Sequence, residues 1–173
     1  MENIDNKLFE KSIKILKDLI GFKTISGENN SSLINYCEDI LKKNGATSFK
    51  VFDENKKRVN LFATLKAKKP NGVEPIILSG HTDVVPVSKG WSTDPFKAEI
   101  KGDKLYGRGS CDMKGFLACS LAFAEVFSNS NFPDVLTTAA TPSFVPTWLS
   151  SVCGEIQFRW MLQLCKPGLT RTP

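Results

Sequence analysis

One stretch of the chain, from Ser79 to Gly115, gathers residue types that could do hydrolytic chemistry. It contains the only histidine of the sequence, His81, with Asp83 two residues later and Asp112 further along. Imidazole nitrogens and carboxylate oxygens are ligands for zinc, and two adjacent cations can together activate a water and polarise an amide carbonyl. These residue types therefore indicate one part of a two-metal hydrolase site.

His81 and Asp83 directly follow the apolar run 75–78, which is typical of a central strand covered on both faces. Ligand sites in open α/β sheets gather at the carboxyl ends of such strands. Residues two apart in a strand point to the same side, so Asp83 is expected beside the imidazole, holding its second ring nitrogen. Gly80 is expected to let the backbone pass close to the site.

Asp112 follows the flexible turn 107–109 and precedes an apolar helical pattern. A carboxylate in this place could bridge two cations and leave each one an open position. Two plainer interpretations exist for the single residues: His81 as a hydrogen-bonded structural histidine, and Asp112 as a helix N-cap. The turn itself lacks both common glycine-rich phosphate-binding patterns.

Hydrophobic periodicity predicts the elements that must position these residues. Helices are expected at 5–22, at 31–43 with Ser31 or Ser32 as its cap, and at 113–127; strands are expected at 49–52, 60–65, 75–78 and 104–106. This order of elements predicts an α/β layered domain.

Composition excludes several classes of function. The chain has 173 residues, 41% of them apolar and 24% charged, which is typical of a globular domain. The net charge of +5 comes mainly from scattered lysines with only four arginines, so no nucleic-acid partner is expected. No apolar run approaches a membrane span and the start lacks a secretory pattern, so the expected location is the cytoplasm, with no membrane partner and reduced cysteines.

The character of the sequence changes after residue 131. Residues 1–131 contain 18 lysines, whereas the last 42 residues contain one, and 136–143 shows no helical or strand period. Two segments are therefore predicted: 1–131 as the N-terminal part of a catalytic domain, and 132–173 as an aberrant tail, frameshifted or irregular.

Three motifs, SGHTDVVPV, W-x-x-DPF and KLYGRGSCDMKG, resemble the M20 family of two-metal peptidases and deacylases. The resemblance covers roughly Phe9 to Phe127 and is closest to the acetylornithine deacetylase branch. It implies part of a catalytic α/β domain, with a central mixed sheet flanked by helices. It also implies His81 as a metal ligand, Asp112 as the bridging ligand, and Asp83 as the catalytic-site carboxylate that orients His81. The implied cofactor is Zn²⁺ at two sites, with Co²⁺ as an alternative.

The reaction implied by the resemblance is hydrolysis of an N-acyl amino acid, here N2-acetylornithine to ornithine and acetate, in arginine biosynthesis. Cys111 and Met113 beside Asp112, with the Trp91 loop, favour this branch; succinyl-diaminopimelate desuccinylase and aminoacylase are the alternatives within the family. Family members are homodimers through a separate lid and dimerisation domain.

The sequence departs from the family pattern in its metal ligands. The family places a Glu-Glu pair and later a second histidine after the bridging aspartate, whereas here Glu125, Asp134 and Glu155 are the acidic residues after Asp112. The lid domain is expected to be absent as well. We therefore expect negligible activity from this chain alone. The alternative to an enzyme fragment is a non-catalytic truncated or frameshifted remnant, or a binding module that retains only the scaffold.

Overall fold

The computed structural model describes residues 2–66, 75–129 and 135–140. All of these lie in the first of two compact units, Met1–Pro142; the second is Ser143–Pro173. The first unit contains, in chain order, α1 (Glu2–Gly21), α2 (Ser31–Lys43), β1 (Thr47–Phe52), β2 (Val59–Leu65), β3 (Ile76–His81), β4 (Glu99–Lys101), β5 (Lys104–Tyr106), a π-helical turn η1 (Ser110–Lys114), α3 (Gly115–Asn129) and β6 (Val135–Ala140).

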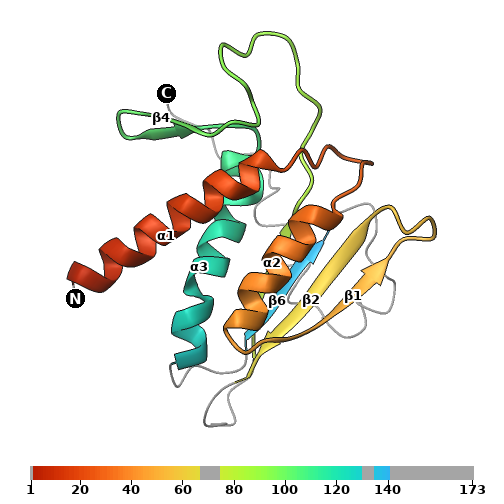
Figure 1. The fold of residues 1–173 in the computed structure, drawn as a ribbon, viewed down its shortest axis with the longest axis vertical. Helices are drawn as coiled ribbons and strands as arrows, with labels where there is room; N and C mark the ends of the chain where they lie inside the picture. Colours follow the sequence, from red (N-terminus) through yellow and green to blue (C-terminus); the bar gives the residue numbers. More distant parts are fainter. Residues whose placement is uncertain (1, 67–74, 130–134, 141–173) are drawn as a thin grey trace, which may run out of the picture. The chain divides into compact units, whose positions relative to one another are not determined.

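The main sheet is mixed and has the strand order β1-β2-β6-β3 (Figure 1). Strands β1, β2 and β6 pair antiparallel, while β3 runs parallel to β6 with Ile76 opposite Val135 and His81 opposite Ala140. Strands β4 and β5 form a separate two-stranded sheet. The predicted α/β class, with a mixed sheet and flanking helices, is confirmed.

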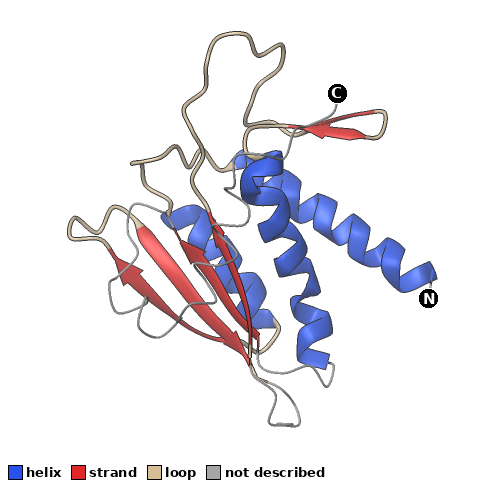
Figure 2. Cartoon of the chain, turned by 180° about the vertical axis from the view of Figure 1, so that it is seen from behind, coloured by secondary structure: helices blue, strands red, loops and turns tan. Residues whose placement is uncertain are grey.

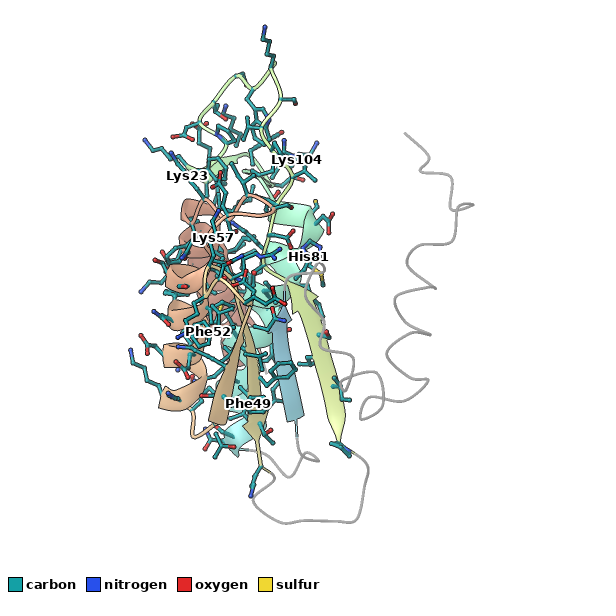
Figure 3. The ribbon with its side chains drawn as sticks, turned by 90° about the vertical axis from the view of Figure 1, so that its right-hand side faces the viewer. Lys23, Phe49, Phe52, Lys57, His81 and Lys104 are labelled. Carbon is teal, nitrogen blue, oxygen red and sulfur yellow. The ribbon has the colours of Figure 1, made fainter. Side chains whose placement is uncertain are left out.

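The described helices lie on one side of the main sheet, as Figures 2 and 3 show. They bury one continuous apolar core against the sheet, with Leu19 and Ile20 from α1, Leu33 and Ile34 from α2, and Ala122 and Ala124 from α3 all fully buried. Helices α1 and α3 are also linked at their surface by an ion pair between Lys11 and Glu125, at 2.9 Å. At about 25 cal/mol per Å² of apolar surface, this burial is the main term holding the helices to the sheet.

The start of α2 differs from the prediction that Ser31 or Ser32 caps it. The N-cap residue is Asn30, and its side chain makes no capping hydrogen bond. Its amide instead joins β2 through both backbone groups of Val59, at 2.9 Å each, and contacts Thr82 Oγ1 at 3.3 Å. Tertiary pairing of this buried amide thus replaces the local cap that the sequence suggested.

Strand β3 is not the doubly covered central strand that its apolar run predicted. Ile76 is 40% exposed, and within the described residues β3 pairs only with β6 and so forms an edge of the sheet. The buried strand is β2, in which six of seven residues are buried. Apolar residues alone did not distinguish the two strands, because pairing order is set by non-local contacts.

Strand β6 occupies part of the stretch 136–143 for which no period was visible, so the expectation of irregular sequence is wrong there. It lies between β2 and β3 and pairs with both, with Leu136 opposite Thr64 and Ile77. Its backbone pairing with two neighbours compensates for a weak local pattern. The proposed boundary after residue 131 stays a prediction, and the rest of the proposed tail lies outside the described residues. No helix in the described ranges is long and apolar enough to span a membrane.

Candidate metal centre

The three predicted site residues come together at the carboxyl end of β3. His81 is the last residue of β3, Asp83 follows in the next loop, and Asp112 lies in η1. The Nε2 atom of His81 is 2.9 Å from Oδ1 of Asp112, and its Nδ1 atom is 3.4 Å from Oδ1 of Asp83. Figure 3 shows His81 at the end of its strand, next to the helical segment that carries Asp112.

The environment of the imidazole indicates which ring nitrogen carries a proton. Nδ1 lies 3.0 Å from the backbone carbonyl oxygen of Asp83, which can only accept a hydrogen bond, so a neutral ring that binds a cation through Nε2 would carry its proton on Nδ1. The Nε2 lone pair then faces a carboxylate oxygen of Asp112. Two acceptors this close require a proton or a cation between them. The pair therefore fits the nitrogen and oxygen ligand set of zinc.

Asp83 lies beside His81 as expected, but its shorter contact with the ring is through its backbone carbonyl rather than its carboxylate. The carboxylate is mostly buried, with 16% of the side chain exposed. Its Oδ2 accepts a hydrogen bond of 2.6 Å from the Ser26 hydroxyl, while Oδ1 is buried and makes no hydrogen bond. One carboxylate oxygen is thus fixed from the loop before α2, and the other is directed toward the imidazole.

Asp112 is not a helix N-cap. It lies inside η1, whose N-cap residue is Gly109, and α3 begins only at Gly115. The turn starts at Gly109, whose φ of +82° is in the left-handed region that favours glycine. The Asp112 side chain is 87% exposed, so its carboxylate is open to solvent on the side away from His81.

A buried lysine anchors η1 to the end of α1. Lys114 is fully buried, and its Nζ donates hydrogen bonds to the carbonyls of Leu19, at 2.9 Å, and Phe22, at 2.8 Å, at the end of α1. Burial lowers the pKa of this ammonium to about 8, and the nearby Cys37 thiol opposes the shift. Lysine close to a helix C-terminus satisfies carbonyls that lack intrahelical partners. It joins α1 to the turn that carries Asp112.

Gly80 supplies the close approach that the sequence analysis expected, but to α3 rather than to a ligand. A Cβ atom at this position would lie 2.8 Å from Leu117 Cδ2 and 3.2 Å from Met113 Cε. The strand that carries His81 and the segment that carries Asp112 are therefore in direct contact. This packing sets the spacing between the two residues.

The site opens into a cavity of about 440 Å³, whose lining includes Ser26, His81, Asp83, Trp91, Arg108 and Asp112. The Arg108 guanidinium stacks 5.1 Å from the centre of the Trp91 ring and donates to the Pro86 carbonyl at 3.3 Å. Its Nε atom is buried without a hydrogen bond. Arg108 therefore holds the Trp91 loop against the cavity wall through a cation–π contact.

Sequence reasoning did not identify Ser26 or Arg108 as parts of this wall. Ser26 belongs to none of the motifs in the sequence, and Arg108 lies in the turn 107–109, which was expected only to be flexible. Both act through partners distant in sequence, Asp83 and Trp91, and a single sequence contains no local signal for such pairs.

The fold and the site together define an α/β domain with a histidine–carboxylate pair at a strand end, and comparison with known proteins shows which family it resembles. Residues 77–142 match the model of peptidase family M20/M25/M40. The matched segment contains His81, Asp83 and Asp112, and over these residues the chain is similar to this family of hydrolases. The predicted resemblance is confirmed at the level of the family.

Curated relatives and solved structures agree with this assignment. The chain is 43% identical over 125 residues to succinyl-diaminopimelate desuccinylase of Rickettsia akari (strain Hartford), covering 69% of this chain and 32% of the relative. It is 45% identical over 128 residues to the protein of that name in Rickettsia canadensis (strain McKiel), covering 70% and 32%. The chain thus spans about a third of the length of these relatives. They do not confirm the acetylornithine deacetylase assignment.

Among solved structures, human carnosine dipeptidase 1 superposes with a TM-score of 0.68 at 20% identity, over 92% of this chain and 38% of that one. An M20 family metallo-carboxypeptidase from Sulfolobus solfataricus gives a TM-score of 0.62 at 24% identity, over 75% and 30%. At these identities the comparison establishes the fold. It supports the partial catalytic-domain architecture.

Proposed function

We propose that this chain forms the N-terminal part of the active site of a metal-dependent hydrolase that cleaves the amide bond of N-acyl amino acids. The observation that carries the proposal is the 2.9 Å approach of His81 Nε2 to Asp112 Oδ1, which brings together a nitrogen and an oxygen ligand from segments 31 residues apart. A structural histidine would not need an exposed carboxylate at its second nitrogen.

His81 and Asp112 would hold the metal, and Asp83 would orient His81. Zinc is the cation proposed first, because one imidazole and a carboxylate suit it, and Co²⁺ prefers similar ligands. A cation at this site would supply Lewis acidity toward the amide carbonyl and a lowered pKa for a coordinated water. The protein's own contribution is to fix the ring, to accept the Nδ1 proton at the Asp83 carbonyl and to place the Asp112 carboxylate beside Nε2.

The substrate class follows from the family and the relatives. The curated relatives are named succinyl-diaminopimelate desuccinylases. They favour succinyl-diaminopimelate, an N-succinyl diamino acid, as the substrate of a protein that contains the whole catalytic domain. Acetylornithine remains the alternative that the Cys111–Met113 and Trp91 motifs suggested. Both reactions hydrolyse an amide on a small amino acid, so the role proposed for His81 and Asp112 is the same in each.

A non-catalytic remnant is the second candidate. The sequence contains one histidine and no Glu-Glu pair after Asp112, and lysines almost disappear after residue 131. One His and one or two carboxylates supply at most about three of the ligands that two zinc ions need. The chain by itself is therefore expected to bind zinc weakly and to hydrolyse neither acyl amino acid at a measurable rate.

Calorimetric zinc titration of the whole chain tests the metal site. His81→Ala and Asp112→Asn should each weaken binding by about tenfold or more, since each removes or weakens a proposed ligand. Asp103→Asn, an exposed carboxylate in the turn between β4 and β5, is the matched control and should leave the affinity unchanged. Equal zinc affinities for the unsubstituted chain and the three variants would contradict the proposed site.

Hydrolysis assays with both acyl amino acids, with zinc or cobalt added, separate the two candidates. Negligible turnover together with zinc binding at His81 supports an incomplete hydrolase site. Turnover at rates ordinary for enzymes would contradict the expectation of an inactive chain. Absence of zinc binding would favour the remnant.

A further inference from the structure

The loop between α1 and α2 lies directly against the segment that follows β3. The Ser26 amide donates to the Val84 carbonyl at 3.0 Å, and the Val84 amide donates to the Thr24 carbonyl at 2.9 Å. Ile25 and Val84 form a parallel bridge. This loop therefore has a fixed backbone register against the residues on either side of Asp83.

Buried side chains reinforce that register. The Thr24 hydroxyl donates to the Thr82 carbonyl at 2.6 Å, and both residues are buried. The Asn30 amide joins the other end of the loop to β2 and to Thr82. A loop held at both ends by buried polar contacts presents its middle residue, Ser26, in a defined position.

Ser26 uses this position to hold the carboxylate of Asp83. Its hydroxyl is 2.6 Å from Asp83 Oδ2, a distance typical of a strong hydrogen bond from a hydroxyl to a carboxylate. The same hydroxyl lies 3.4 Å from the Val84 carbonyl, a much longer contact. The short bond fixes the carboxylate plane and leaves Oδ1 facing His81 Nδ1, at 3.4 Å.

We infer that Ser26 is a positioning residue for the metal centre, acting through Asp83 on His81. By holding the Asp83 carboxylate on the Nδ1 side of the ring, the Ser26 hydroxyl keeps a negative charge beside the Asp83 carbonyl, and both favour the tautomer with its proton on Nδ1. That tautomer leaves Nε2 as a free lone pair directed at Asp112. The inference rests on the proposed function, because it makes Nε2 the metal-binding nitrogen.

A purely structural role is the competing explanation. In that case the Ser26 hydroxyl would only stabilise the loop, and its removal would lower stability without changing the imidazole. The two explanations differ in what happens at His81. His81 is the only histidine of the chain, so ¹⁵N NMR of labelled histidine reports this one ring without overlap.

The test uses the whole chain with the imidazole neutral and without metal, and then with zinc alone as the probe. Without metal, both tautomers of the unsubstituted protein should be populated, because Asp83 accepts at Nδ1 and Asp112 accepts at Nε2; with zinc, the tautomer with its proton on Nδ1 should dominate. Ser26→Ala should raise the population of the other tautomer at least about twofold and weaken zinc binding about threefold to tenfold, below the loss for a direct partner of a ligand. Ser26→Thr keeps the hydroxyl and should restore both values.

Ser128→Ala is the matched control, because the Ser128 hydroxyl only donates to the Glu125 carbonyl within α3. If Ser26→Ala does not fold, Ser26→Cys keeps a weak donor of similar size and should give intermediate values. Tautomer populations and zinc affinity that stay within measurement error in the folded alanine or cysteine variant would overturn the inference.

The outcomes also separate this inference from the proposed function. If zinc leaves the His81 signals of the unsubstituted protein unchanged, the metal site is wrong, and with it the role of Ser26 toward a metal. If zinc shifts Nε2 in every variant with equal affinity, the metal site stands and the role of Ser26 is wrong.

Discussion

The two sides of the candidate metal centre differ sharply in how they are held. His81 and Asp83 are mostly buried and contact a loop that buried Thr24 and Asn30 fix in place. Asp112 is 87% exposed and lies in a short irregular turn. The imidazole of His81 is thus held in place before any ligand binds. Asp112 is supported only through the turn that Lys114 anchors, and its carboxylate faces solvent.

This difference has a physical consequence for ligand binding. A fixed imidazole costs little entropy when it binds a cation, whereas an exposed carboxylate must be ordered at the moment of binding. The open side of Asp112 is also the side from which further ligands could approach. Substitutions of residues that support the turn around Asp112 should therefore alter metal affinity without altering the contact between His81 Nδ1 and Asp83.

The largest effect is expected from Lys114→Met, which should loosen the turn that carries Asp112 and leave the surroundings of His81 and Asp83 unchanged. It removes the ammonium donor from the Leu19 and Phe22 carbonyls, which keep only the backbone N–H groups of Phe22 and Thr24, and relief of the buried charge offsets this loss only in part. We expect the free energy of unfolding to fall by about 2 kcal/mol in urea titrations, and zinc binding to weaken. The NMR signals of His81 Nδ1 should stay unchanged.

Lys104→Met provides the control for Lys114, since Lys104 is exposed in β5. It should leave the unfolding free energy within about 0.5 kcal/mol of the unsubstituted value. Equal stability of the two variants would mean that the buried ammonium does not anchor the turn.

A smaller effect is expected from Gly80→Ala, which acts where the two sides meet. The new methyl group would overlap Leu117, which is 3% exposed and has little room to move. We expect a loss of about 1–2 kcal/mol in thermal or urea unfolding, with weaker zinc binding because the turn is displaced from His81.

Gly21→Ala is the matched control, because nothing lies within 4 Å of a Cβ atom there and Gly21 ends α1. It should be neutral or slightly stabilising. If Gly80→Ala proved as harmless as Gly21→Ala, the contact between β3 and α3 would not set the geometry of the site.

The smallest effect on stability is expected from Glu38 in α2, which is not part of the candidate site. Hydrogen bonds from Lys50 and Lys42 lower the pKa of Glu38 from 4.5 to about 2. A carboxyl group with a lowered pKa in the folded state stabilises the fold above its ordinary pKa. That contribution, about 1 kcal/mol after allowance for solvent, should be lost as the pH falls from 4.5 toward 2.

Urea titrations across this pH range check the prediction, with Glu38→Gln as the comparison. The glutamine variant should be less stable at neutral pH and should lose less stability on acidification. Parallel pH profiles would show that the ion pairs contribute nothing, and zinc binding at neutral pH should be the same in both proteins.

Much of this organisation could be predicted from local sequence, and the exceptions share a cause. Apolar periodicity located α1, α2, α3 and strands β1, β2 and β3 to within a few residues. The edge position of β3 could not be predicted, because it depends on the insertion of β6, whose own residues carry little pattern. Motif spacing indicated that His81, Asp83 and Asp112 would meet.

The details of the site lay beyond local reasoning. Asn30 was missed as an N-cap residue because its amide pairs with β2, and Ser26 was missed because its partner is 57 residues away. The buried position of Lys114 could not be inferred either, since a lysine in a glycine-containing turn is usually exposed. Each of these residues acts through contacts that exist only after folding.

Anomalous X-ray diffraction at the zinc absorption edge, from crystals of the whole chain soaked in zinc, tests the central claim most directly. The account predicts a zinc peak bound by His81 Nε2 and an Asp112 carboxylate oxygen, with Asp83 on the far side of the ring and not bound to zinc. A peak elsewhere, or zinc bound through His81 Nδ1, would contradict it.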